Sequence, residues 1–162
     1  MSVERIAGTS TSPGYSGKPP WQKLGLMPGL RVWLRHAPAD YWALCGFEPA
    51  SVAILPANTR RYDFGHLFAS RRTVLERDLP AAARKLGVGG MLWISWPKKS
   101  SGVASDVSEG TLREIALPLG LVDVKVCALT QIWSGLKFVW RRPQAAVSSS
   151  RKQKLQMKEG QA

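Results

Sequence analysis

Short apolar runs alternate with amphipathic stretches along most of this chain. The run at 91–96 lies between a glycine pair and Pro97. Six residues are too few for a helix, so the run predicts a strand buried on both faces. Alternation of apolar and polar residues over 122–128 predicts a half-exposed strand near a sheet edge. The remaining apolar runs predict strands at 30–35, 51–55, 62–69 and 136–140.

Helical periodicity fills the intervals between these strands. A short helix is expected at 39–46, and a longer one carries apolar residues at spacings of four, three and four: Leu75, Leu79, Ala82 and Leu86. Pro80 should kink or split this longer helix. Asp106 and Glu109 have the spacing of a capping box for the next helix, and a turn is expected at 132–135.

The order of these elements predicts the fold class. Strands that alternate with helices indicate an α/β, Rossmann-like, doubly wound domain with a mostly parallel sheet of about six strands. The last two strands are expected to form a C-terminal antiparallel hairpin. Residues 14–142 should form this domain, with an irregular lead-in at 14–29. Residues 1–13 should be a disordered N-terminal tail, and residues 143–162 a disordered basic C-terminal tail.

The net charge of the chain limits the kinds of partner that it is expected to bind. The chain has a net charge of +12, and from Arg141 onward six Lys or Arg residues face one Glu. Most of the remaining positive charge therefore belongs to the folded part. A basic domain attracts an anionic small molecule, an acidic protein or nucleic acid, the last through the basic tail. The alternative to a specific nucleic-acid role is solubility together with an acidic partner.

Other composition features exclude several kinds of site. Cys45 and Cys127 lie among apolar residues and are expected to be free thiols of a reducing cytoplasm. No stretch of eighteen apolar residues occurs, so no membrane segment is expected. The sequence has no phosphate-binding P-loop, no H-E-x-x-H motif and no cysteine pair at zinc spacing, and no metal is predicted.

A candidate ligand site follows from the topology. The carboxyl ends of parallel strands share one edge of the sheet, and the loops there hold ligands. The loops expected at that edge contain cationic, aromatic and hydroxyl residues: Arg71, Arg72, Trp96, Lys98, Lys99, Ser100, Ser101, Trp133 and Ser134. Cations beside indole rings suit a phosphate-bearing ligand, and a helix N-terminus after Ser70 would favour the same charge. The alternative is a solvated basic loop with both tryptophans in the core.

The two histidines have different expectations. His36 follows a strand and is the candidate catalytic acid or base, although no carboxylate partner is visible in the sequence. His66 alternates with Phe64 and Phe68 and is expected to be a core residue. Ser100, Ser101 and Ser134 lie in no nucleophile elbow.

Several segments resemble known families. The segments 62–68 and 86–93 resemble strand motifs of the class I methyltransferase fold, in a reduced form with one central strand missing. More specifically, the chain resembles a family of small uncharacterised bacterial proteins classed as a domain of unknown function. The residues that carry this second resemblance are YSGKPPWQKLG, HAPADY, LWISWPKKSSG and GLVDVKVCALTQIWSGLKFVWRR, within 14–142.

The chain departs from methyltransferases where the family binds S-adenosylmethionine. The family resemblance implies a glycine-rich turn after the first strand and an acidic residue after the second. Here the turn at 35–40 contains no glycine, and residues 55–58 contain no carboxylate. No cofactor is therefore predicted. The sequence favours a binding module for an anionic ligand or acidic partner, with two alternatives: an enzyme acting on a phosphorylated or nucleotide-like substrate, or a nucleic-acid-associated protein.

Overall fold

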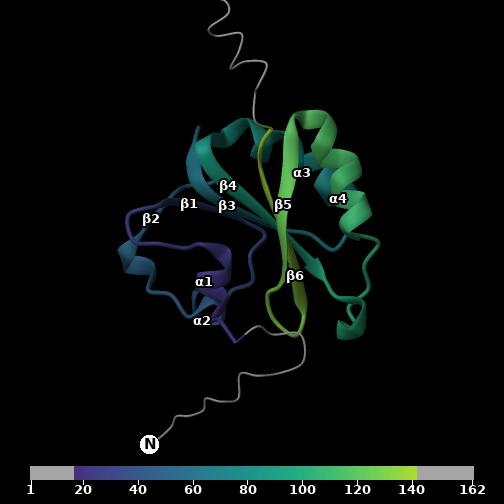
Figure 1. The fold of residues 1–162 in the computed structure, drawn as a ribbon, viewed down its shortest axis with the longest axis horizontal. Helices are drawn as coiled ribbons and strands as arrows, with labels where there is room; N and C mark the ends of the chain where they lie inside the picture. Colours follow the sequence, from purple (N-terminus) through teal and green to yellow (C-terminus); the bar gives the residue numbers. More distant parts are fainter. Residues whose placement is uncertain (1–16, 142–162) are drawn as a thin grey trace, which may run out of the picture.

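The computed structural model describes residues 17–141. In it, six strands form one sheet in the order β2-β1-β3-β4-β6-β5 (Figure 1). Strands β1 to β4 are parallel to one another, whereas β6 is antiparallel to both β4 and β5. The expected mostly parallel sheet with a C-terminal hairpin is confirmed. The strands are β1 (Arg31–Arg35), β2 (Ala53–Ile54), β3 (Tyr62–Phe68), β4 (Leu86–Pro97), β5 (Leu121–Ala128) and β6 (Trp133–Trp140).

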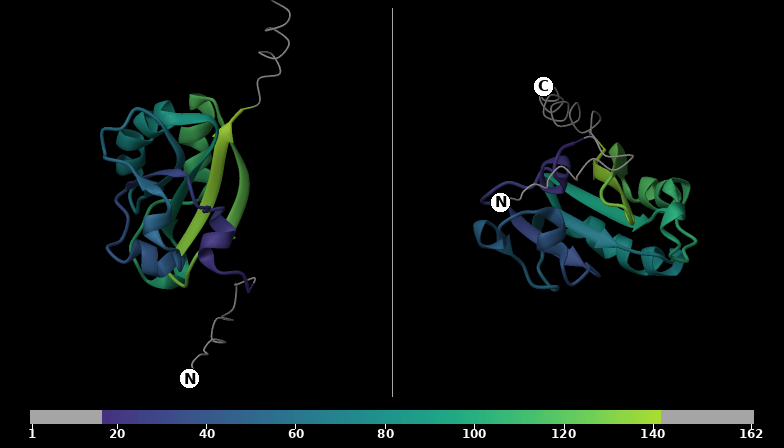
Figure 2. Two further views of the ribbon diagram at one scale, coloured as in Figure 1. Left: turned by 90° about the vertical axis from the view of Figure 1, so that its left-hand side faces the viewer. Right: turned by 90° about the horizontal axis from the view of Figure 1, so that it is seen from below.

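Helices cover both faces of the sheet, which gives three layers (Figure 2). One face carries α1 (Pro20–Leu24) and α2 (Tyr41–Cys45), and the other carries α3 (Arg72–Lys85) and α4 (Glu109–Ala116). Short 3₁₀ helices lie at Pro49–Ser51, Lys99–Ser101 and Leu117–Leu119. No helix within residues 17–141 has the length and apolar character needed to cross a membrane.

Each face of the sheet has its own apolar core. On the α3 and α4 face, Trp33 stacks on Tyr62 with ring centroids 5.3 Å apart. On the α1 and α2 face, Trp93 is fully buried, and its indole donates a hydrogen bond to the Leu24 carbonyl at 2.8 Å. This bond holds α1 against the sheet. The segment expected to be an irregular lead-in therefore contains a helix, which Leu24 and Leu26 attach to the core.

Several expected element boundaries change in the structure. Pro80 lies inside α3 but does not split the helix. Trp133 begins β6, so most of the turn expected at 132–135 belongs to the strand. The capping box expected at Asp106 is wrong: Ser108 is the N-cap of α4, and its partner is Thr111. Both tails expected from the sequence lie outside the described residues.

The two edges of the sheet differ. Strand β2 is only two residues long, and within residues 17–141 no strand pairs with its outer edge, where a doubly wound sheet usually has one more. The missing strand is thus at an edge, not in the centre as expected. At the other edge, β5 is half-exposed as predicted, and its register with β6 shifts between Asp123 and Lys125. This shift is a bulge that leaves Val124 52% exposed.

Candidate functional site

A pocket of about 220 Å³ lies at the carboxyl ends of β1 and β3. The chain proceeds from β1 to β2 on one side and then to β3 on the other, so the strand order reverses here. In doubly wound sheets ligands bind at such a switch point. We call this cavity the switch-point pocket. Its walls are His36, Phe68, Ala69, Ser70, Val74 and Trp133.

His36 enters the pocket wall from the turn directly after β1. Its φ of 58° makes it the one non-glycine residue with positive φ within residues 17–141. This backbone region costs about 1–2 kcal/mol for a residue with a side chain. His36 Nε2 lies 2.7 Å from Asp78 Oδ2 on α3. The turn that the family resemblance associates with glycines thus holds an imidazole, which is paired with a carboxylate.

Asp78 is 9% exposed and has three basic neighbours. Arg77 donates to both carboxylate oxygens at 2.9 and 3.0 Å, and Arg35 lies 3.9 Å away. The hydrogen bond from Arg77, opposed by burial and reinforced by the bond from His36, lowers the pKa of Asp78 to about 2. Asp78 is therefore ionised at neutral pH and accepts the hydrogen bond from His36 Nε2. In the neutral form of the imidazole, Nδ1 is then the acceptor, and it has no hydrogen-bond partner within residues 17–141.

Aromatic rings form the apolar part of the pocket. Phe68 is 2% exposed, and its ring meets Trp133 edge to face with centroids 4.9 Å apart. On its other side Phe68 stacks on His66 at 4.3 Å. His36 and Trp133, both expected at this edge from the sequence, therefore line the same cavity.

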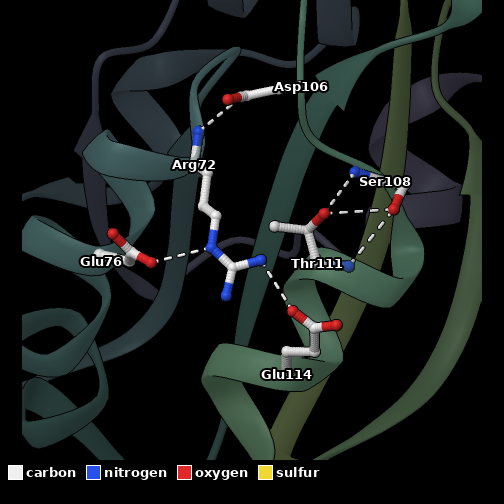
Figure 3. A network of polar contacts seen from close by, with 6 residues as sticks. All are labelled: Arg72, Glu76, Asp106, Ser108, Thr111 and Glu114. Atoms are coloured by element: carbon white, nitrogen blue, oxygen red, sulfur yellow. Dashed lines mark hydrogen bonds and ion pairs between the residues drawn. The ribbon is translucent and has the colours of Figure 1, made fainter.

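The N-terminus of α3 was expected to hold an external anion, but the chain supplies its own. Asp106 Oδ1 accepts a hydrogen bond from the Arg72 backbone N–H at 2.7 Å (Figure 3). The Arg72 guanidinium donates to Glu76 at 2.8 Å and to Glu114 at 2.7 Å. Arg72 thus ties α3 to α4, and its charge is balanced by these two carboxylates.

The two tryptophans expected to flank a ligand lie on opposite faces of the sheet. In the register of β4 with β6, Trp133 is opposite Pro97, whereas Trp96 is opposite Ser134. Trp96 is 7% exposed and packs in the α3 and α4 core. Trp133 packs against the other core. The structure does not bring these two indoles together.

The basic loop after β4 does not line the switch-point pocket. Lys99 and Ser100 are exposed, and Ser101 Oγ donates to the Lys98 carbonyl at 2.7 Å. The Lys98 backbone N–H donates a hydrogen bond to the Ile132 carbonyl at 2.7 Å, which ties this loop to the turn before β6. Arg71 is exposed beside Ser70, which places it next to the pocket wall.

His66 is a core residue, as the alternation predicted. It is fully buried, with Nδ1 2.8 Å from the Tyr41 hydroxyl and Nε2 2.8 Å from Ser95 Oγ. Burial lowers the pKa of His66 to about 3, so the ring is neutral at physiological pH. Within residues 17–141 no three His, Cys, Asp or Glu side chains are grouped so that they could hold a metal ion. Cys45 and Cys127 are free.

Sequence reasoning missed Asp78, although a signal for it exists. Leu75, Leu79 and Ala82 mark the buried face of α3, and Asp78 lies between them on that face. A carboxylate in such a position needs a partner, because an unpaired buried charge is costly. His36 and Arg77 provide that partner.

Comparisons with known proteins identify the fold. No protein-family model and no curated protein matches the chain. Among solved structures, precorrin-6y C5,15-methyltransferase from Geobacter metallireducens GS-15 matches with a TM-score of 0.52 and 13% identity, over 75% of this chain and 85% of that one. A SAM-dependent methyltransferase from Aquifex aeolicus gives 0.52 and 13%, over 72% and 85%.

A third neighbour, magnesium protoporphyrin IX methyltransferase from Synechocystis PCC 6803 with bound SAM, gives a TM-score of 0.51 and 12% identity over 72% of each chain. Similarity at these identities shows the fold alone. The domain therefore has a class I methyltransferase-like Rossmann fold.

Proposed function

We propose that this protein binds a small anionic ligand with a planar ring in the switch-point pocket. The observation that carries the proposal is the pocket itself, because it combines aromatic walls with one imidazole acceptor at the place where doubly wound sheets bind ligands. Phe68 and Trp133 offer ring faces and edges, and Val74 closes the apolar side. A cavity of about 220 Å³ suits a single ring with one substituent.

The negative charge of the ligand is inferred from what surrounds the pocket. Asp78 is already neutralised by Arg77 and Arg35, so it does not repel an anion strongly. Arg71 is exposed beside Ser70 and has no ion-pair partner within residues 17–141. A phosphate or carboxylate at the pocket mouth would lie near this guanidinium, which binds such groups in a bidentate manner.

S-adenosylmethionine is excluded from this proposal. The Synechocystis neighbour binds it, but here His36 and Pro38 take the turn after β1 where the family resemblance implies glycine. The loop after β2 also lacks a carboxylate, and its Ala57 carbonyl accepts a hydrogen bond from the Trp33 indole at 3.1 Å. The cavity is smaller than the 300–1,000 Å³ that is usual for cofactor-sized ligands.

The test is a thermal-shift screen of the full chain with aryl phosphates, nucleoside monophosphates, aromatic carboxylates and S-adenosylmethionine. A ligand at a hundredfold excess over its Kd adds about 2.7 kcal/mol, which raises Tm by several degrees. Val74→Phe fills the pocket and should abolish the shift. Val88→Phe is the matched control, because Val88 is 93% exposed at the opposite end of β4.

The outcomes of the thermal-shift screen decide whether the switch-point pocket is the ligand site. A ring-bearing anion that shifts the wild type and the Val88 variant but not the Val74 variant supports the proposal. A shift with S-adenosylmethionine would restore a methyltransferase function. A shift that the Val74 variant retains, or no shift with any compound, would refute the pocket as the ligand site.

A second function, an enzyme acting on a phosphorylated or nucleotide-like substrate, is favoured by the His36–Asp78 pair. The carboxylate orients the imidazole, and Nδ1 is the atom that would accept a substrate proton. His36→Gln should then abolish turnover, a loss much larger than any weakening of ligand binding that the change in the pocket wall causes. Turnover that survives this substitution would remove the catalytic role.

The proposal also includes the family of the chain and the compartment in which it acts. We assign it to the small bacterial family that its motifs resemble, acting in the cytoplasm. Two of those motifs, HAPADY and the segment 120–142, contribute His36 and Trp133 to the pocket wall. Two free cysteines are compatible with a reducing compartment.

A further inference from the structure

Positively charged side chains gather at the amino ends of the parallel strands, at the opposite end of the sheet from the switch-point pocket. Arg61 directly precedes β3 and Lys85 directly precedes β4. These two strands are neighbours, and their first residues, Tyr62 and Leu86, are register partners. The Lys85 ammonium donates a hydrogen bond to the Thr59 carbonyl at 2.7 Å, which ties the end of α3 to the segment before β3. Arg61 and Lys85 therefore lie beside each other at the start of the sheet.

Strand β6 ends at the same place, because it runs antiparallel to β4 (Figure 1). The indole of Trp140, its last residue, donates to the Leu86 carbonyl at 2.9 Å. Arg141 follows directly. Its backbone N–H donates to the Gly120 carbonyl at 2.8 Å, and its guanidinium donates to the Leu117 carbonyl at 3.4 Å. With the sequence neighbours of the first two cations, five residues form what we call the amino-edge patch: Arg60, Arg61, Arg84, Lys85 and Arg141.

Carboxylates do not balance the charge of the amino-edge patch. None of its five residues forms an ion pair within residues 17–141. Two carboxylates lie near the starts of the strands, but each is already paired: Asp63 with Arg31 at 3.0 Å and Asp123 with Arg113 at 3.1 Å. Every carboxylate of α3 and α4 is likewise paired with an arginine. Glu48 lies before β2, and β1 separates that strand from the patch.

An exposed bulge of β4 lies within the amino-edge patch. Residues 87–90 of β4 oppose the single residue Asp63 of β3, so the strand loops outward there. The two residues at its tip are exposed, and Val88 reaches 93%. The Arg61 side chain lies at the base of the bulge, since a Cβ on Gly87 would be 3.4 Å from its Cγ. The cations therefore surround a part of the surface that a large anion can reach.

We propose that the amino-edge patch binds the phosphate backbone of a single-stranded nucleic acid, at a site separate from the switch-point pocket. The five cations cover the ends of three adjacent strands, β3, β4 and β6, a width of about 10 Å. Such a width suits several consecutive phosphates better than one phosphate group. Four of the five residues are arginines, whose planar guanidinium binds phosphate in a bidentate manner.

The sequence beyond the described residues favours a long anion. Residues 142–162 contain five Lys or Arg and one Glu, and they follow Arg141 directly. A nucleic-acid strand that crosses the patch has further phosphates to offer to these cations. A membrane surface fits less well, because binding to a membrane interface scales with the apolar area that is buried. Val88 is the one large apolar residue in the bulge at 87–90.

The experiment is fluorescence anisotropy of the full chain with a labelled oligouridylate of about twenty nucleotides, at salt concentrations from about 50 to 200 mM. For a single strand, the logarithm of the binding constant falls with the logarithm of the salt concentration, with a slope of about 0.7 per phosphate contact. Arg60→Gln/Arg61→Gln should weaken binding by about tenfold or more at the lowest salt and lower the slope by about 1.4. Glutamine keeps the Cγ that packs beside Gly87. Arg84→Gln, on α3, should lower the slope by about 0.7.

The charge-matched control is Lys98→Gln/Lys99→Gln, because these lysines follow the opposite end of β4. This variant should bind the RNA with the slope of the wild type. The proposal would be overturned by a lack of RNA binding at the lowest salt, or by equal losses in the two double variants. RNA binding that Arg60→Gln/Arg61→Gln leaves unchanged would assign the binding to residues 142–162 alone and would also overturn it. Vesicles of phosphatidylcholine and phosphatidylglycerol test the membrane alternative: binding to them but not to RNA would show that the patch is a membrane surface.

Discussion

Replacing Asp78 with a neutral residue should lower the free energy of unfolding and should make that free energy less sensitive to acid. Its pKa falls from 3.8 in a reference peptide to about 2 in the folded protein, mainly through the hydrogen bond from Arg77. A shift of about two units corresponds to about 2.5 kcal/mol. Arg77, the main cause of the shift, is 62% exposed, so solvent screening reduces this value. Asp78→Asn should therefore lower the free energy of unfolding by about 1–2 kcal/mol at pH 7.

The sign of the pH dependence follows from the direction of the shift. Because the folded pKa lies below the unfolded one, the stabilisation is complete above about pH 5 and is lost as the pH falls toward 2. Urea unfolding of wild type and Asp78→Asn from pH 7 to pH 2.5 measures both effects. The variant should show a flatter decline in acid.

A matched control is Asp40→Asn, because Asp40 is exposed and makes no side-chain cap hydrogen bond to α2. This variant should unfold within about 0.5 kcal/mol of wild type at every pH. If Asp78→Asn also stayed within that range, or kept the full acid decline, the ion-pair account of Asp78 would be refuted. The same result would also refute the role of Asp78 in orienting His36.

Three further predictions concern the core and the α3 cap. His66 is neutral when folded, so stability should fall by about 1.4 kcal/mol per pH unit below pH 6.5, a decline that His66→Leu removes in urea unfolding. Gly65→Ala should cost more than about 2 kcal/mol in thermal unfolding, since the added Cβ would lie 2.5 Å from the rigid Tyr62 ring; a wild-type Tm would contradict this. Asp106→Ala should cost about 1 kcal/mol in the same assay, because the Arg72 N–H loses its acceptor.

Most of the fold was predictable because the spacing of apolar residues and the length of each apolar run can be read from short stretches of sequence. The run at 91–96 predicted the buried part of β4, and the alternation at 122–128 predicted the half-exposed edge strand β5. The extension of β4 back to Leu86 was missed, because Gly87, Gly89 and Gly90 read as a turn. Gly87 and Gly90 instead pass close to β3, where a Cβ on Gly90 would lie 2.7 Å from the Asp63 carbonyl oxygen.

The candidate site was predictable only in part, because its contacts depend on register and on distant pairs. The edge of the sheet and two wall residues, His36 and Trp133, follow from the topology. The separation of Trp96 from Trp133 depends on which residue of β4 is opposite which residue of β6. The His36–Asp78 contact joins residues 42 positions apart, and no local pattern encodes such a distance.

The exposed edge of β5 has a consequence for self-association. An eight-residue edge strand offers unpaired backbone groups to a second chain, and proteins hinder this with a bulge or a lysine on the edge. Here the bulge at Val124 and the neighbouring Lys125 serve that purpose together. Lys125 thus keeps copies of the protein apart as well as contributing positive charge. Replacing Lys125 with an apolar residue should allow β5 to pair with the edge strand of a second copy. The protein should then form dimers or fibres, which size-exclusion chromatography detects.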